Sequence, residues 1–196
     1  MTTSPPPDRT ASASDVALVR RATDGDLSAF EALVERHRDV AVRVAGRIVG
    51  REEAEDVSQD AFLRAFHRLE RFRGDAPFRS WLLRIVHNAA LDHHARQRPE
   101  PVDPAGLHES DAPSVRLPAE QLEVRERIER LEDKLRLLAP SHRSVLVLRD
   151  VEGLSYEEIA EIADMPLGSV KGRLHRARQE FIEMLRLNTY DWELPR

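Results

Sequence analysis

Apolar residues recur every three to four positions through most of the chain, which is the spacing of helices with one buried face. The pattern predicts helices over about 30–49, 52–69 and 78–96, and further helices between about 120 and 187. Between the second and third of these, the segment FRGDAP (72–77) carries the glycine and proline of a loop. No segment alternates apolar and polar residues well enough to predict a strand. The expected fold class is therefore all-α.

Polar residues mark where several helices should begin and end. Ser28 followed by Glu31, and Ser155 followed by Glu158, have the spacing of capping boxes, in which each side chain bonds to the other residue's backbone N–H. Gly50 is expected to end the helix that begins near Ser28.

A proline-rich stretch divides the helical segments into two groups. Residues 99–119 contain five prolines and little periodicity. A structureless stretch of that length is unusual inside one compact domain, which favours a linker between two small domains. The predicted division is a disordered arm over 1–13, a first helical domain over 14–98, a linker over 99–119, a second helical domain over 120–187 and a C-terminal tail over 188–196.

The second domain contains the pattern of a helix-turn-helix over residues 155–181. A short helix with Ile159, Ala160 and Ala163 on its inner face is interrupted at Met165, because the following proline disfavours helical geometry. Asp164 stands in the turn, where glycine is usual, and aspartate tolerates left-handed geometry better than most residues. A second helix is predicted to begin near Ser169, with one apolar stripe formed by Val170, Leu174, Ala177 and Phe181.

The opposite face of this second helix is basic and polar. It consists of Lys171, Gly172, His175, Arg176 and Gln179, with Arg173 and Arg178 on its flanks. Such a face suits the major groove of DNA, where long cations contact phosphates and inner positions contact base edges. An ordinary solvated face is the alternative, but spacing, turn and charge agree on DNA binding. Gly172 costs about 1 kcal/mol of helix propensity, and a helix pressed against a DNA backbone is one reason to keep it.

The net charge of −5 does not exclude nucleic acid, because charge is segregated along the chain. Residues 78–98 and 168–180 each carry four Lys or Arg against one acid, whereas 51–60 carry five acids against one Arg and 155–164 carry four acids and no base. The absence of cysteine excludes disulfides, thiol nucleophiles and thiolate zinc sites. No apolar run has the length of a membrane span, so a cytosolic protein without membrane insertion is expected.

Three segments together resemble a known family. The segment FRGDAPFRSWLLRIVHNAALDHHARQRP is similar to regions 2.3–2.4 of the sigma-70 family, EDVSQDAFLRAFHRL to region 2.2, and the helix-turn-helix to region 4.2. Over about residues 15–187 the chain resembles the small extracytoplasmic-function (ECF) sigma factors, with the 99–119 linker where a region 3 would stand. The resemblance implies a region 2 bundle and a region 4 helix-turn-helix joined by a flexible linker.

The resemblance also implies partners: core RNA polymerase, through its β′ clamp helices and β flap, promoter DNA and an anti-sigma factor. It implies that one acidic helix face docks on the clamp helices, and this face consists of Asp56, Gln59, Asp60 and Leu63. It implies that the −10 element is held as single-stranded DNA by Phe72, Arg73, Gly74, Asp75, Ala76, Arg84, Asn88 and Arg96. It implies that the −35 duplex is contacted by Ser169, Lys171, Gly172, Arg173, His175, Arg176 and Arg178.

The residues alone leave some of these roles open. A solvated surface is the simpler interpretation of the acidic face, and core packing is an alternative for Phe72 and the preferred one for Phe78 and Trp81. Asn88 lies mid-helix, where its propensity is poor, so it needs a bonding partner. Gly172 replaces the Ser or Thr that the family often has, so one polar contact to the −35 element is expected to be lost.

Two other function classes compete with this interpretation. A helix-turn-helix regulator that acts on duplex DNA without polymerase explains 155–181 but leaves 51–98 without a role. A metal enzyme is suggested by His87, Asp92, His93 and His94. These histidines offer no i, i+4 ligand pair, and His87 and His94 lie about 10 Å apart along a helix axis. We therefore expect no metal, no cofactor and no catalytic residue.

Overall fold

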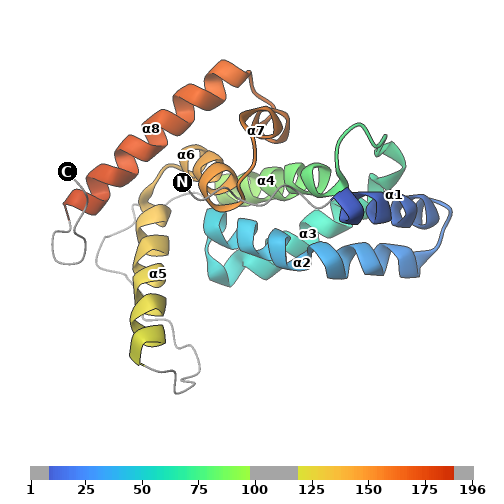
Figure 1. Cartoon of the computed structure of the whole chain (residues 1–196), viewed down its shortest axis with the longest axis horizontal. Helices are drawn as coiled ribbons and strands as arrows, with labels where there is room; N and C mark the ends of the chain where they lie inside the picture. Colours follow the sequence, from blue (N-terminus) through green and yellow to red (C-terminus); the bar gives the residue numbers. More distant parts are fainter. Residues whose placement is uncertain (1–8, 98–118, 188–196) are drawn as a thin grey trace.

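The computed structural model describes residues 9–97 and 119–187, and all regular elements within these ranges are helical (Figure 1). The all-α fold class is confirmed, with one group of helices on each side of the gap between the two ranges. The predicted tail over 188–196, and the predicted linker apart from its last residue, lie outside the described residues.

The first group forms a helical bundle. It consists of α1 (Arg9–Thr23), α2 (Leu27–Val49), α3 (Arg51–His67), a 3-10 turn (Leu69–Arg71) and α4 (Phe78–Arg96). The helices α2, α3 and α4 pack against one another, and α1 lies along α2. Their core is aliphatic, with fully buried Leu33, Val44 and Ile48 from α2 and Leu82, Leu83 and Val86 from α4. Because α1 begins at Arg9, residues 9–13 are helical where the sequence predicted a disordered arm.

The start of α2 differs from the sequence prediction. Its N-cap is Asp26, whose carboxylate accepts a hydrogen bond from the Ala29 backbone N–H at 3.3 Å and one from the Ser28 hydroxyl at 2.6 Å. The predicted Ser28–Glu31 capping box is therefore wrong: a charged acceptor makes stronger hydrogen bonds than a hydroxyl, and Ser28 serves it as a donor. Hydrogen bonds from Ser28 and Arg21 lower the pKa of Asp26 to about 2. Gly50 ends α2 as predicted, with φ +113°.

The second group comprises α5 (Ala119–Leu137), α6 (Pro140–Leu146), a π-helical turn (Val147–Val151), α7 (Tyr156–Ala163) and α8 (Leu167–Arg186). The predicted capping box at the start of α7 is confirmed: the Glu158 N–H donates to Ser155 Oγ at 3.1 Å, and the Ser155 N–H donates to Glu158 Oε2 at 2.8 Å. Asp164 adopts left-handed geometry in the turn, with φ 50° and ψ 54°, as the sequence analysis allowed. Helix α8 begins at Leu167, directly after Pro166 and slightly before the expected position.

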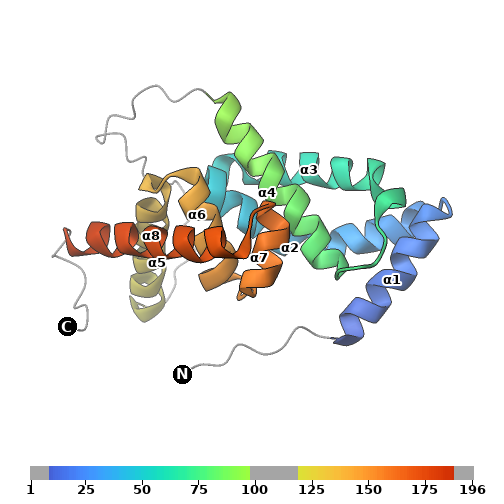
Figure 2. The same cartoon turned by 90° about the horizontal axis from the view of Figure 1, so that it is seen from above.

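The two groups of helices pack directly against each other. In Figures 1 and 2, α7 lies beside α4, and α6 lies at the junction with α2 and α4. Helix α8 slants away from this junction, and α5 stands across the end of α2 (Figure 1). Buried side chains from both groups belong to one continuous hydrophobic cluster. The helix-turn-helix is therefore held against the first bundle in this structure.

Candidate promoter and polymerase interfaces

Helix α8 has the two faces that its sequence predicted. Val170, Leu174 and Ala177 are buried, and Phe181 is half-buried against the same core. The polar residues of the other face are exposed: Lys171, Gly172, His175, Arg176 and Gln179, together with Ser169 near the start of the helix. Arg173 and Arg178 are half-buried, as expected of the flanks. The row of exposed polar side chains runs along one side of a rigid helix, which is the form of a groove-reading surface.

The inner face of α7 differs in detail from the prediction. Ile159 and Ile162 are the buried residues, while Ala160 and Ala163 are only half-buried. Spacing alone predicted the two alanines for the inner face, and Ile162 was not predicted. Burying an isoleucine removes more apolar surface from water than burying an alanine, which favours Ile162 at the buried position.

The two arginines at the centre of α8 differ in their surroundings. Arg178 binds Asp150 of the π-helical turn through Nε at 3.0 Å and Nη2 at 2.5 Å, and this hydrogen bonding raises the pKa of Arg178. Arg176 is exposed and forms no ion pair within the described residues. Arg176 therefore presents a cation that DNA can use directly, whereas Arg178 already shares its charge with a carboxylate.

Gly172 has no packing partner that requires glycine. A methyl group placed on its Cα would meet no atom within 4 Å. The interior of the protein therefore does not explain why a weak helix former stands on the exposed face.

The loop at residues 72–77 is anchored by aromatic rings and exposes its tip. The Phe72 ring packs edge-on against Phe78 and Trp81, with centroids 5.7 and 5.3 Å apart. Phe78 is buried and Trp81 is half-buried against the core, which confirms the core interpretation of these two residues. Gly74 has φ +79°, a conformation that favours glycine.

Beyond the anchor, the loop and the helix after it present polar groups to solvent. Arg73, Gly74 and Asp75 are exposed and Ala76 is half-buried. The structure thus gives the segment a fixed base at Phe72 and an open tip.

Asn88 lies on α4 with its side chain exposed, and Arg84 is exposed one turn before it. The bonding partner that the sequence analysis expected for Asn88 is His87, whose Nδ1 lies 3.3 Å from Asn88 Oδ1. His87 is buried, its Nε2 lies 3.2 Å from Ser144 Oγ of α6, and burial lowers the pKa of its imidazole. Arg96, at the end of α4, is exposed.

The side chains that suggested the competing metal-enzyme hypothesis do not converge. His87 is buried against α6, His93 Nε2 lies 3.2 Å from Glu53 of α3, and Asp92 accepts from Arg64. Within the described residues no group of three or more metal-ligating side chains converges.

The acidic face of α3 is open to solvent. Asp56, Gln59 and Leu63 are exposed, with Leu63 retaining 62% of its accessible surface, and Asp60 pairs with Arg64 at 2.7 Å. Val57, Ala61 and Ala65, on the other side of the helix, are buried. An exposed leucine among carboxylates is a combination suited to a protein partner with an apolar and basic surface.

Comparison with known proteins places this geometry in a family. Residues 33–100 match Sigma-70 region 2, and residues 128–181 match Sigma-70 region 4. The chain is 35% identical to an ECF RNA polymerase sigma-E factor of Haemophilus influenzae over 179 residues, which cover 85% of this chain and 92% of the relative. The chain belongs to the ECF group of the sigma-70 family. It is accordingly an RNA polymerase sigma factor, a transcription initiation factor and not an enzyme.

Further relatives agree with this assignment of the sigma factor. An ECF RNA polymerase sigma-E factor of Escherichia coli is 36% identical over 181 residues, covering 85% of this chain and 91% of the relative. The structure of CnrH in complex with the cytosolic domain of CnrY is similar with a TM-score of 0.66 and 31% identity, over 90% of this chain and 99% of CnrH. The sigma factor RpoE of Bartonella quintana, in complex with the anti-sigma factor NepR, shares the fold at a TM-score of 0.61 and 20% identity, over 83% and 98% of the two chains.

One group of charged residues in this sigma factor could not be predicted from local sequence patterns. Glu152 lies between Arg43 and Arg79, and its side chain is only 3% exposed. These residues are far apart in the sequence, so no local spacing could have revealed their contact. Within the described residues, no helix is long and apolar enough to cross a membrane.

Proposed function

We propose that the sigma factor reads the −35 element with the exposed face of α8. The observation that carries this proposal is the separation of faces on α8, where Val170 and Leu174 are buried while His175 and Arg176 point outward. Direct readout of base edges needs side chains on a rigid element that fits the major groove. Lys171 and the flanking Arg173 and Arg178 then serve as phosphate contacts that fix the register of the helix.

The second part of the proposal assigns the −10 element to the loop at 72–77 and to α4. A base that has left the duplex must be held by a pocket with polar groups, because its hydrogen bonds to the other strand are lost. The exposed amide of Asn88, and Arg84 one turn earlier, lie on the helix that follows the open loop tip. We propose that Arg96, exposed at the end of α4, contacts the backbone of the same strand.

The third part assigns protein partners. We propose that Asp56, Gln59, Asp60 and Leu63 dock on the β′ clamp helices of core polymerase, and that the second group of helices contacts the β flap. The exposed carboxylates around an exposed leucine support the first of these contacts. We also propose that an anti-sigma factor binds this chain, as NepR binds the Bartonella quintana protein, and that the sigma factor works in the cytoplasm.

Open-complex formation by the reconstituted holoenzyme tests the −10 assignment. Asn88→Ala is expected to impair transcription from an intact promoter, because a base edge loses its hydrogen-bonding partner. A template already mismatched across the −10 element is expected to restore much of the activity, since the cost of unpairing has been removed. Gln97→Ala, an exposed amide at the end of α4, is the control and is expected to leave both templates unaffected. Equal activity of the Asn88 variant on both templates would place the pocket elsewhere.

Co-purification with core polymerase tests the docking face. Asp56→Arg combined with Asp60→Arg is expected to abolish binding while the circular dichroism of the free protein stays unchanged, because both side chains lie at the surface. Glu31→Arg combined with Glu35→Arg is the matched control on the exposed side of α2. Normal polymerase binding by the α3 variant would overturn the docking assignment.

A further inference from the structure

A buried carboxylate of α1 lies outside all the interfaces proposed above. Asp15 is bonded through both of its oxygens to adjacent residues of α2: Oδ1 accepts from Arg36 Nη1 at 2.5 Å, and Oδ2 lies 2.9 Å from His37 Nε2. A carboxylate that is withdrawn from water needs partners that replace its hydration. Both partners come from the same turn of α2, so Asp15 fixes α1 to that turn.

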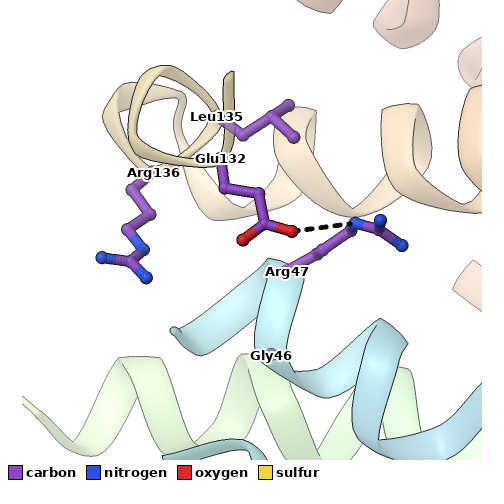
Figure 3. Close-up of a pocket in the computed structure, with 5 residues that line it drawn as sticks. All are labelled: Gly46, Arg47, Glu132, Leu135 and Arg136. Atoms are coloured by element: carbon purple, nitrogen blue, oxygen red, sulfur yellow. Dashed lines mark ion pairs between the residues drawn. The ribbon is translucent and has the colours of Figure 1, made fainter. Parts of the chain in front are cut away.

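Another carboxylate that pairs with α2 is more open to solvent. Figure 3 shows Glu132 of α5 directed toward Arg47, with Oε1 and Nε 3.8 Å apart and side chains 19% and 22% exposed. The side chains of Asp15 and His37 are 4% and 8% exposed, and their bonded atoms are closer together. Pairs that water can reach hold their side chains loosely, whereas a buried and bonded pair keeps one geometry. The contact between Asp15 and His37 is therefore suited to fixing the orientation of the imidazole ring.

The proton on His37 follows from its surroundings. Burial lowers the pKa of His37, against the opposing effect of Asp15, so the imidazole is neutral at neutral pH. A neutral imidazole has one N–H, and an ionised carboxylate can only accept, so Nε2 of His37 donates to Asp15. This hydrogen bond sets both the tautomer and the orientation of the ring.

The His37 ring packs against the aromatic residues at the base of the loop at 72–77. Its centroid lies 5.3 Å from that of Phe78, the first residue of α4. Phe78 in turn packs against Phe72 at 5.7 Å and against Trp81 at 5.6 Å. The ring planes are tilted or edge-on to one another, which is the arrangement that aromatic pairs prefer at these separations. A shift of the imidazole is therefore passed on to Phe78 and Phe72.

Helix α1 also contacts the other end of the loop. The 3-10 turn Leu69–Arg71, which leads into the loop, packs against α1, and α1 contacts α4 as well. Leu69 and Val19 of α1 are both buried in the same hydrophobic cluster. The loop is thus supported from α1 at both ends, directly before Phe72 and through His37 and Phe78 after it.

We propose that Asp15 and His37 are positioning residues for recognition of the −10 element: they orient the rings of Phe78 and Phe72 and so fix the loop that holds the unpaired base. The inference rests on the proposed assignment of this loop to the −10 element. A site must hold its polar groups within about 0.5 Å of the productive geometry to function. Loss of the bond between Asp15 and His37 frees the rings, and the loop then accepts incorrect bases more readily.

Fluorescence of Trp81 tests the structural part of the inference in the free, full-length protein. The chain has two tryptophans, so Trp192→Phe leaves Trp81 as the only one. In this background, Asp15→Asn is expected to raise the quenching of Trp81 by acrylamide. An amide offers one oxygen where Arg36 and His37 both need an acceptor, so the bonded turn and the rings beyond it loosen.

Two further variants separate the ring contact from stability. His37→Gln keeps an N–H donor for Asp15 but has no ring to pack against Phe78, and it is also expected to raise the quenching of Trp81. This variant keeps the test usable if Asp15→Asn unfolds. Val44→Ala, at a buried position about 10 Å further along α2, is the control for loss of packing in the same bundle and is expected to leave the quenching unchanged.

Open-complex formation by the holoenzyme tests the functional part. Each base of the −10 element is replaced in turn, and the opening rate on the parent promoter is divided by the rate on the promoter with the replaced base. At the position where the parent protein discriminates most, Asp15→Asn and His37→Gln are each expected to lower this ratio about fivefold. Binding to the −35 duplex is expected to stay unchanged. A protein that is only destabilised, such as Val44→Ala, supplies fewer active molecules on every template, so its ratio equals that of the parent.

Either of two results would overturn the inference. The first is unchanged quenching of Trp81 in both the Asp15 and the His37 variant, and the second is a parental ratio of opening rates despite higher quenching. The quenching measurement needs neither DNA nor polymerase, so its failure is distinct from failure of the −10 assignment, which the Asn88 variant tests on intact and mismatched templates.

Discussion

Helices α4 and α8 have nearly the same length, 19 and 20 residues, but nine residues of α4 are buried and only four of α8. Helix α4 is covered by α2 and α3 on one side and by α6 and α7 on another. Helix α8 packs against α5, α6 and α7 and leaves its polar face to solvent. A helix that is apolar around most of its circumference belongs inside a protein, whereas a helix with one apolar stripe belongs at its surface.

The difference bears on how each helix can contact DNA. On α4, the exposed Arg84 and Asn88 are spaced i, i+4, so the helix offers one narrow strip and few positions that can change without damaging the core. On α8, a broad face of exposed side chains surrounds Arg176, and substitutions there leave packing intact.

Adjacent residues on α4 give the largest expected effects. Leu83→Ala, at a fully buried position, is expected to lower the free energy of unfolding by about 2–5 kcal/mol, because a cavity replaces packed atoms. Arg84→Ala, at the exposed neighbour, is expected to change stability by less than about 0.5 kcal/mol while it weakens promoter opening. Chemical denaturation and open-complex assays measure the two quantities. A loss below about 1 kcal/mol for Leu83→Ala would show that α4 is not held as rigidly as its burial indicates.

Arg176 and Arg178 of α8 give the next largest effects, which are on DNA affinity. Arg176→Ala is expected to cost about 1–3 kcal/mol of −35 binding and to change the preferred sequence, because the exposed cation is proposed to contact base edges. Arg178→Ala is expected to weaken binding equally on every sequence and to reduce the salt slope by about 1. The pairing of Arg178 with Asp150 makes its loss the smaller of the two. Holoenzyme titrations against a library of −35 duplexes at several salt concentrations distinguish them, and equal sequence-blind losses would remove the case for base readout by α8.

The sequence could predict the features that depend on residues close together in the chain. The faces of α8, the cap at Ser155 and the left-handed Asp164 all follow from residues within a few positions of one another, and the structure confirms them. The start of α2 was missed because Asp26 and Ser28 are both good caps, and only the folded turn shows which of them accepts.

Other features of the fold depend on residues that are distant in the sequence. The covering of α4 by α7, and the ion pairs of Glu152 with Arg43 and Arg79, join segments about 70 to 110 residues apart. No periodicity distinguishes Glu152 from a solvated loop glutamate. The need of Asn88 for a partner was predictable from helix propensity, but the identity of that partner, His87, and its link to Ser144 were not.

Acid titration tests the buried histidines, His87 on α4 and His37 on α2. Burial lowers the pKa of His87 and of His37 on α2 from the ordinary 6.5, so the folded protein binds protons less readily than the unfolded chain. Their contribution to stability is therefore complete above pH 6.5 and is lost as the pH falls below it, by up to about 1.4 kcal/mol per pH unit for each proton taken up.

Denaturation midpoints between pH 7 and pH 5 measure this loss. His87→Gln is expected to flatten the slope in that range. A slope that His87→Gln does not change would contradict a lowered pKa of this imidazole in the folded protein.

Glycine substitutions on α8 give the smallest effects and test why the exposed face contains a weak helix former. Gly172→Ala is expected to raise the free energy of unfolding by about 0.5–1 kcal/mol, because the methyl group meets open space and the unfolded chain loses freedom. The same methyl group is expected to weaken −35 binding if the helix backbone approaches the DNA at this point. Gly168→Ala, earlier on α8 and equally free of neighbouring atoms, is the matched control: it is expected to stabilise the protein without changing DNA affinity. Denaturation and −35 duplex binding by the holoenzyme are measured on both variants. If Gly172→Ala gains stability and keeps full affinity, α8 does not approach the DNA backbone at residue 172, and its readout must come from the longer side chains alone.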